Sequence, residues 1–202
     1  MTEKNINTET IILNAARVVF QHKGFDGARM QEIADEAKIN KSLLHYYYRS
    51  KELLFEAIFN EALLKFIPKI SIVLSSDISL EMKVEAFVES YINMLIENPF
   101  LPGFVLNEIS RNPEKIIGLI LQLGVNPNKL DAILQKEIEQ GKIKNISSKE
   151  FIVNLISMCV FPFIAKAIIQ GFLFGNNNKE AQQFLLERKK SIPKFFMNAI
   201  KK

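Results

Sequence analysis

Helical periodicity runs through almost the whole chain and is the feature that most restricts its fold. Within residues 9–23, apolar side chains recur at the three- and four-residue spacing that places them on one face of a helix: Ile12, Ala15, Ala16, Val19 and Phe20. Gly24 is expected to end this helix, because glycine readily takes the left-handed conformation found just past a helix. Segments that alternate apolar and polar residues are hard to find, and only 8 glycines and 7 prolines interrupt the 202 residues. The sequence therefore predicts an all-α protein.

Two short helices joined by a tight turn are predicted next. The first covers Met30–Ala37, and the connection Lys38–Asn40 leads into the second, Lys41–Tyr48. Asn40 is suited to open the second helix, because its side chain can accept a backbone N–H from the first turn. Such a pair has the geometry of a helix-turn-helix, which presents its second helix to the major groove of DNA.

A longer helical region follows. Ser50 is a suitable N-cap for a long fourth helix, which we expect to end at Pro68. Asparagine–proline pairs and glycines separate the later segments. The further predicted helices are Leu80–Glu97, Phe100–Arg111, Pro113–Leu123, Pro127–Gln140, Ser148–Phe172 and Lys179–Ile200. We therefore expect about nine helices in two domains, a small three-helix domain over residues 1–55 and a larger, more apolar one over residues 56–202.

Charge limits how a DNA-binding role can be argued. The formal net charge of +4 and the isoelectric point near 9.0 permit a nucleic-acid partner. Residues 1–60, however, contain eight cations and eight anions, so this region carries no net formal charge. Any contact with DNA must therefore depend on where the cations lie.

The second helix of the pair carries residues suited to that contact. It begins Lys41-Ser42-Leu43, and the free backbone N–H groups of its first turn favour phosphate. Tyr46 and Tyr47 suit contacts with sugar, phosphate and thymine methyl groups. Arg49 and Lys51 add cations just past the end of the helix. The sequence therefore indicates double-stranded DNA as a partner.

The run IADEAKINKSLLHYYYRSKEL from Ile33 to Leu53, with Gly24-Phe25-Asp26-Gly27 before it, resembles the DNA-binding signature of the tetracycline-repressor (TetR) family. The resemblance covers residues 9–60. It implies a homodimer, mainly a repressor, whose two recognition helices lie about one DNA turn apart on a pseudo-palindromic site. It also implies a ligand in the larger domain that changes the separation of these helices. The positions that match the family's DNA contacts are Gln31, Lys41, Ser42, Leu43, Tyr46, Tyr47 and Lys51.

Some residues depart from the family pattern. Ala28 and Arg29 stand where threonine or serine is frequent, so the usual cap and phosphate hydroxyl of the second helix are missing, and Arg29 is expected to replace that contact with its charge. Leu43 stands where a small hydroxyl residue is common and is expected to meet a thymine methyl group. His45 replaces a larger aromatic residue, and a packed neutral histidine is a simpler interpretation than a DNA contact.

The larger domain has the aromatic content of either a ligand cavity or a filled core. Twelve of the 16 phenylalanines lie beyond residue 60, and both interpretations stay open at this point. Lys166 interrupts the apolar stretch Phe151–Phe174, where it either meets a carboxylate or, more commonly, extends to solvent. The candidate pocket residues for an apolar or amphipathic effector are Phe87, Tyr91, Phe104, Asn107, Glu108, Met158 and Lys166.

The last two predicted helices carry more apolar surface than one helix pair can bury, which favours a partner chain. The family resemblance implies that these helices form a four-helix bundle from two chains. The candidate interface residues are Ile156, Val160, Phe163, Ile164, Ala167, Phe184 and Phe195. Pro162 is expected to kink its helix. The basic residues from Arg188 to Lys202 are interpreted as a solvated face and a frayed end.

The sequence does not favour an enzyme, a metal site or a bound cofactor. Only His22 and His45 are present, without a glycine-rich phosphate loop or metal-ligand spacing. A single cysteine, no signal-peptide core and an interrupted Phe151–Phe174 stretch lead us to expect a cytoplasmic protein without a membrane span. The alternative is a helical protein that does not bind DNA, but carries a lipid-like ligand or binds a partner helix. A steep salt dependence of duplex binding distinguishes the two.

Overall fold

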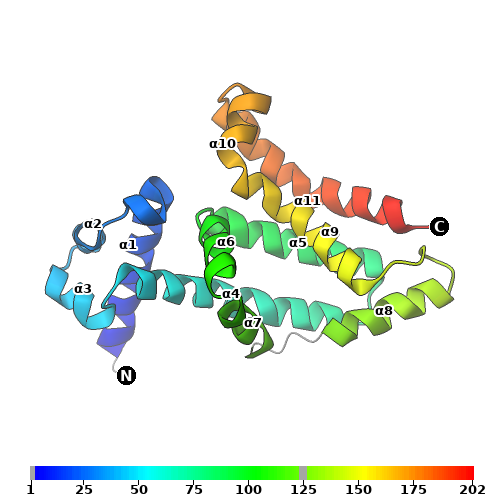
Figure 1. Cartoon of the computed structure of the whole chain (residues 1–202), viewed down its shortest axis with the longest axis horizontal. Coiled ribbons are helices and arrows are strands. Elements are labelled where there is room, and N and C mark those ends of the chain that lie inside the picture. The colour runs from blue at the N-terminus through cyan, green and yellow to red at the C-terminus, as the bar shows by residue number, and fades with distance from the viewer. Residues whose placement is uncertain (1–2, 123–126) are drawn as a thin grey trace. The chain divides into compact units, whose positions relative to one another are not determined.

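Helices make up nearly all of the chain, as the periodicity predicts (Figure 1). The computed structural model describes residues 3–122 and 127–202, and over this range it contains eleven α-helices and one π-helix. The β pairing found within these residues is a single antiparallel bridge between Ile143 and Lys201. The predicted all-α fold class is therefore confirmed.

The first of two compact units holds the helix-turn-helix. It contains α1 (Glu3–Gly27), α2 (Met30–Glu36), α3 (Lys41–Tyr47) and α4 (Lys51–Ser75) as far as Lys65, together with the segment Asn98–Val105. This unit extends beyond residue 55 because α4 continues without a break and still buries Phe59 and Ala62. Its fully buried side chains are Ile12, Ala16, Phe20, Ile33, Ala34, Leu44, Leu54, Phe55 and Ile58.

Gly24 interrupts α1 at the predicted position. Its φ of 68° lies in the left-handed region, which glycine enters without the steric strain that a Cβ atom causes. The break turns the last residues of α1, and Phe25 meets the rings of Phe20 and Phe55 at centroid distances of 6.0 and 5.3 Å. The glycine therefore positions an aromatic ring as well as ending the regular helix.

Five aromatic rings from distant parts of the sequence meet in the first unit. This phenylalanine cluster consists of Phe20, Phe25, Phe55, Phe100 and Phe104. Phe55 is at its centre, stacked on Phe104 with centroids 3.9 Å apart and meeting Phe100 edge-on at 5.4 Å. Phe104 lies on α6 (Leu101–Arg111), so the start of that helix completes the core of the first unit.

The second unit packs around α5 (Leu80–Glu97), which contacts both α9 (Ser148–Ile164) and α11 (Asn178–Ile200), while these two helices also contact each other. Its other helices are α7 (Pro113–Gln122), α8 (Pro127–Glu139), α10 (Lys166–Ile168) and the π-helix η1 (Ile169–Leu173). The loop after α8 is tied to the end of α11, because the Lys144 backbone N–H donates to the Ile200 carbonyl at 2.7 Å. The core therefore joins elements from both ends of this unit.

Two prolines act differently from expectation. The prediction that α4 ends at Pro68 is wrong, since the helix runs to Ser75. Proline removes one hydrogen bond, but Ile67 and Ile70 on either side stay buried and keep the helix packed. The bend expected near Pro162 falls at Ala165, whose φ of −89° and ψ of 22° leave the helical range. The axis changes by 66° between Ser148–Ile164 and Lys166–Leu173.

Lys83 on α5 is one of the few buried charged residues in the described chain. Its ammonium group donates to the carbonyls of Val73 at 3.0 Å and Leu74 at 3.2 Å, and also to that of Ser76. These carbonyls lie at the C-terminal end of α4, where four acceptors have no partner within the helix. Lys83 thus caps α4, and the negative end of the helix dipole favours its charge.

Membrane-spanning potential is confined to one bent pair of helices. Across residues 3–122 and 127–202, no single helix has the length and hydropathy of a membrane span. The bent pair Ser148–Ile164 and Lys166–Leu173 meets those criteria only when its two parts are taken together.

Candidate nucleic-acid interface

The turn between α2 and α3 is formed by Ala37–Asn40 and is closed by backbone hydrogen bonds. The Lys38 N–H donates to Asp35 at 3.1 Å, and the Ile39 N–H donates to Ala34 at 3.0 Å. Lys38 takes a left-handed conformation with φ 55°, so these bonds form the Schellman arrangement that ends many helices. Asn40 then opens α3 by accepting from the Leu43 N–H at 2.7 Å. The predicted helix-turn-helix and its N-cap are confirmed.

The N-terminus of α2 lacks a hydroxyl cap, as expected from Ala28 and Arg29. The Glu32 carboxylate accepts from the Arg29 backbone N–H at 3.2 Å and from Lys23 at 2.8 Å. The hydrogen bond from Lys23 holds the pKa of the Glu32 carboxyl below its ordinary value. The exposed Arg29 guanidinium forms no hydrogen bond or ion pair with any described residue. It is therefore free to reach a phosphate group.

The recognition face of α3, defined here as Lys41, Ser42, Leu43 and Tyr46, points away from the unit. All four side chains are exposed, and Tyr46 retains 79% of its accessible surface. Leu44 on the opposite side of the helix is fully buried. The buried leucine fixes the rotation of α3 about its axis, which keeps this face in solvent.

Gln31 and Tyr47 differ from the residues of the recognition face. Gln31 is exposed on α2, and its amide donates to Asp35 at 2.8 Å. Tyr47 is half-buried, and its ring meets that of Tyr46 edge-on with centroids 5.5 Å apart. Both side chains therefore have contacts within the chain that a DNA contact must accommodate.

Lys51 is held between two groups at the end of α1. Its ammonium nitrogen lies 4.5 Å from the centre of the Phe25 ring and 3.4 Å from the Asp26 carbonyl oxygen. A cation over an aromatic face is attracted by the electron density of the ring. Because the side chain is only half-buried, its ammonium group keeps access to solvent. The structure thus gives Lys51 a positioning contact that the sequence pattern did not indicate.

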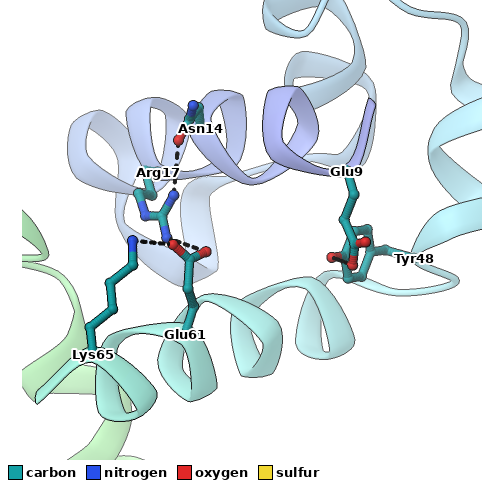
Figure 2. A network of polar contacts seen from close by, with 6 residues as sticks. All are labelled: Glu9, Asn14, Arg17, Tyr48, Glu61 and Lys65. Atoms are coloured by element: carbon teal, nitrogen blue, oxygen red, sulfur yellow. Dashed lines mark hydrogen bonds and ion pairs between the residues drawn. The ribbon is translucent and has the colours of Figure 1, made fainter. Parts of the chain in front are cut away.

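Polar contacts fasten α1 to the residues that follow α3 (Figure 2). The Tyr48 hydroxyl donates to the Glu9 carboxylate at 2.9 Å. Further along, Glu61 of α4 forms ion pairs with Arg17 of α1 at 2.8 Å and with Lys65 at 2.6 Å. Burial, together with the neighbouring Glu9 carboxylate, raises the pKa of Tyr48, so its hydroxyl stays a donor at neutral pH. These contacts hold Tyr48, just past α3, and the middle of α4 against α1.

His45 is exposed rather than packed at the helix junction. Its Nδ1 lies 3.3 Å from the carbonyl oxygen of Arg49, so the neutral ring donates there when Nδ1 carries the proton. The interpretation of His45 as a packed histidine is therefore wrong. The short α3 ends at Tyr47, and the chain leaves the helix before the ring can be covered.

Sequence comparison adds to this geometry. Residues 12–58 match the family described as bacterial regulatory proteins, tetR family. The chain is 24% identical over 174 residues to the probable HTH-type transcriptional regulator YttP of Bacillus subtilis, a match covering 84% of this chain and 83% of YttP. It is 46% identical over 48 residues to the HTH-type transcriptional repressor NicS of Pseudomonas putida, covering 24% of this chain and 23% of NicS. The chain belongs to the tetR family.

The fold of this tetR-family protein also resembles a solved relative over most of its length. The transcriptional regulator FadR of Bacillus subtilis, solved in complex with stearoyl-CoA, superposes with a TM-score of 0.66. This match covers 93% of this chain and 97% of FadR at 17% identity, so it bears on the fold alone. The predicted DNA-binding regulator is confirmed by the family, which consists of transcriptional regulators and not of enzymes.

In this tetR-family protein the predicted pocket residues divide between the two compact units. Phe87 and Tyr91 of α5 form an aromatic group with Phe66 in the second unit, at centroid distances between 5.4 and 5.9 Å. Met158 packs half-buried against the core of the same unit. Phe104, by contrast, belongs to the phenylalanine cluster of the first unit. Its ring is therefore a core residue there.

The polar pocket candidates are placed less deeply than the sequence suggested. Lys166 is exposed at the start of α10, in keeping with the interpretation that it extends to solvent. Glu108 is half-buried on α6 and accepts a hydrogen bond from Asn112 at 3.1 Å. The side chain of Asn107 lies outside the described residues.

The predicted interface residues have different degrees of exposure. Ile164, Ala167 and Phe195 are exposed, whereas Ile156, Val160 and Phe184 are half-buried. Phe163 retains only 7% of its accessible surface and packs in the core of its own unit, so it has little to offer a partner. Phe161 and Phe172, not selected from the sequence, expose 60% and 83%. Periodicity alone could not separate them from Phe163, because the whole stretch is apolar.

Arg188 is the residue whose setting the sequence analysis missed. Interpreted as part of a solvated tail, it is instead half-buried on α11 and donates from Nη2 to the Met158 carbonyl. The cluster of lysines around it gave no signal of this, because α11 turns this one cation toward α9.

Proposed function

We propose that this tetR-family regulator is a cytoplasmic repressor that binds a pseudo-palindromic DNA site as a homodimer. Residues 1–55 are the DNA-binding part, and residues 56–202 bind the effector and form the dimer. A small apolar or amphipathic ligand then releases the protein from DNA. The observation that carries this proposal is the exposed recognition face on a helix whose other side is fixed by Leu44.

The chemistry of this face supports contacts of two kinds. Lys41 and the N-terminal N–H groups of α3 suit phosphate, while Ser42 and Leu43 suit base edges and a thymine methyl group. Tyr46 is exposed enough to meet a sugar or a base. Lys51 follows α3 in sequence and Arg29 precedes α2, and the charges of both side chains are accessible to phosphate. Phosphate contacts position the protein, and base contacts select the sequence.

A large apolar surface on the last helices supports a homodimer. Phe161, Ile168, Phe172 and Phe195 are exposed on α9, α10, η1 and α11. Large apolar side chains exposed in this number are typical of a surface that a second chain covers, and a two-fold axis buries them against the copy. Two recognition helices then meet successive major grooves on one side of the duplex.

The relatives support repression and ligand response. NicS is a transcriptional repressor, and FadR was solved with stearoyl-CoA, a ligand with a long apolar chain and a charged head. The aromatic groups of the second unit suit an apolar chain of this type. A dimer that covers a promoter and leaves it on ligand binding accounts for both properties.

Selection of bound duplexes from a random pool with the full-length protein tests the proposal. We expect a site with two inverted half-sites whose centres lie about 10 base pairs apart, or a small multiple of that spacing. Affinity for this site should fall steeply as salt rises, because each neutralised phosphate releases counterions. Adding the protein to a promoter that contains the site should reduce transcription in vitro.

Two results contradict this proposal. An enriched site without inverted symmetry rejects the homodimeric arrangement. Duplex binding that is absent, or independent of salt, favours a helical protein that carries a lipid-like ligand or binds a partner helix. A double variant Lys41→Ala, Ser42→Ala serves as the control for specific enrichment, since both residues are exposed and their replacement leaves the core unchanged.

A further inference from the structure

Among the described residues, Arg188 has no negatively charged partner, although much of its guanidinium group is removed from water. Its Nη2 donates to the Met158 carbonyl at 2.5 Å, whereas its buried Nε finds no acceptor among the described residues. The guanidinium carbon lies 5.4 Å from the centre of the Phe184 ring. Burial lowers the pKa of Arg188, but an arginine remains charged at neutral pH. An unpaired buried donor on a charged group is unfavourable, and most such groups are satisfied in folded proteins.

The neighbouring side chains do not supply the missing negative charge. Cys159, fully buried on α9, is close enough for the charge of Arg188 to act on its thiol, yet burial raises the pKa of this thiol to about 12. Burial also raises the pKa of Tyr91, on α5, to about 12. Both groups are therefore neutral at physiological pH. Glu187, the residue before Arg188 on α11, accepts from Gln183 at 2.9 Å instead.

The surroundings of Arg188 are apolar apart from these neutral groups. The Phe184 ring lies against the guanidinium group, and the backbone carbonyl of Met158 accepts from it. Tyr91 joins Phe66 and Phe87 in the aromatic group of the same unit. A cation at the edge of an apolar, aromatic region matches a ligand with an anionic end and an apolar body. The planar guanidinium group binds carboxylate and phosphate oxygens through parallel N–H bonds.

We propose that Arg188 binds the anionic head group, a carboxylate or a phosphate, of an amphipathic effector whose apolar part lies against Met158, Phe184 and the aromatic group of α5. This proposal rests on the proposed function for its regulatory meaning. It replaces Lys166, which is exposed, as the cation of the ligand site. The proposal predicts that the protein prefers ligands with a negative charge at one end.

Isothermal titration of the full-length protein with three ligands of equal chain length tests the proposal: octanoate, octyl phosphate and 1-octanol. We expect at least one of the anions to bind about tenfold more tightly than the alcohol, the factor that corresponds to one charge-assisted hydrogen bond. The anion that binds better identifies the head group as carboxylate or phosphate. Arg188→Met should reduce anion affinity to that of the alcohol, while alcohol binding shows that the apolar region is intact.

Two further variants keep the test decisive. Lys190→Met removes an exposed cation from the same helix and should preserve the preference for the anion. Arg188→Lys keeps the charge without the planar pair of donors and should retain part of the preference for the anion over the alcohol. This variant tests the site if Arg188→Met does not fold. A preference that survives in Arg188→Met, equal affinities in the wild type, or no binding of any probe overturns the proposal. If Arg188→Met loses the dimer but keeps the wild-type ligand preference, the proposal is also overturned, because Arg188 then contacts a second copy of the chain and not the ligand.

Parallel measurement of DNA affinity separates this site from the proposed function. Anion binding that depends on Arg188 but leaves DNA affinity unchanged supports the site and contradicts an effector role. Specific DNA binding by a protein that shows no anion preference supports the regulator and rejects the site.

Discussion

Single residues around α3 fall into two groups, those that face solvent without a partner and those held within the chain. Lys41 and Ser42 belong to the first group, since no described residue binds either side chain. Lys51 belongs to the second, with its ammonium group against the Phe25 ring and the Asp26 carbonyl. A lysine held in place loses less conformational freedom when it meets a phosphate than one that is free in solvent. The two groups should therefore respond differently to substitution.

Lys51→Ala should weaken binding to all DNA sequences alike and reduce the salt slope by about one, because it removes one phosphate contact. Ser42→Ala should instead change the preference at particular base positions, by about 1–3 kcal/mol at each affected pair. Fluorescence anisotropy on the selected site and on random duplex, at several salt concentrations, measures both effects. Lys69→Ala, at an exposed lysine further along α4, is the control and should change neither. Equal losses on both duplexes for Lys51→Ala and Ser42→Ala contradict these assignments.

Sequence patterns identified the recognition face because the signals that create it are local. The Asn40 cap and the spacing of Leu44 are each readable within one helical turn. The contact between Glu9 and Tyr48 and that between Arg188 and Met158 join residues 39 and 30 positions apart. Periodicity describes which face of a helix is apolar, but it contains no information about which distant side chain will meet it. These long-range pairs could be found only in the folded chain.

At the scale of helices, the length of α4 depends on which donors bind the carbonyls of its last turn. Pro68 interrupts its hydrogen bonds, yet the helix continues to Ser75, where Lys83 binds three carbonyls of its final turn and the residue after it. Sequence rules predict an end at proline because they weigh the lost hydrogen bond alone. The packing of Ile67 and Ile70 and the capping ammonium group outweigh that loss.

Lys83→Met should lower the free energy of unfolding by about 2–3 kcal/mol, since hydrogen bonds to a charged group contribute more than neutral ones and the carbonyls of Leu74 and Ser76 lose this donor. Urea denaturation followed by circular dichroism measures this change. Lys69→Met, on the exposed side of α4, serves as the matched control and should leave stability within about 0.5 kcal/mol. A Lys83→Met protein as stable as the control rejects the capping role.

At the scale of the whole molecule, exposed apolar side chains bear on assembly, and buried titratable groups bear on how stability depends on pH. Phe172→Glu places a charge at the most exposed of the apolar positions on η1 and should shift the proposed dimer toward monomer. Sedimentation velocity at several concentrations measures the shift. Met82→Glu changes an exposed apolar residue on α5 and should leave the dimer intact. Equal dissociation of the two variants contradicts an interface at η1.

Stability should fall in alkaline solution because of Cys159. Burial raises the pKa of its thiol from 9.0 to about 12, so the unfolded chain loses this proton at a lower pH than the folded chain. The stabilisation is complete below pH 9.0 and is lost as the pH rises toward about 12. Within this window the wild type should lose about 1.4 kcal/mol per pH unit more than Cys159→Ala. Urea denaturation at several pH values measures the free energy of unfolding of both proteins. If this free energy falls with pH at the same rate in the two proteins, the prediction is contradicted.

The phenylalanine cluster has a consequence for how the protein is made. Residues up to 65 contain every helix of the helix-turn-helix, but the rings of Phe100 and Phe104 that pack on Phe55 come later in the chain. A ribosome must therefore complete all of α5, a helix of the second unit, before the core of the first unit can close. A gene fragment that stops at residue 65 therefore encodes the recognition helix without the two rings that complete its support.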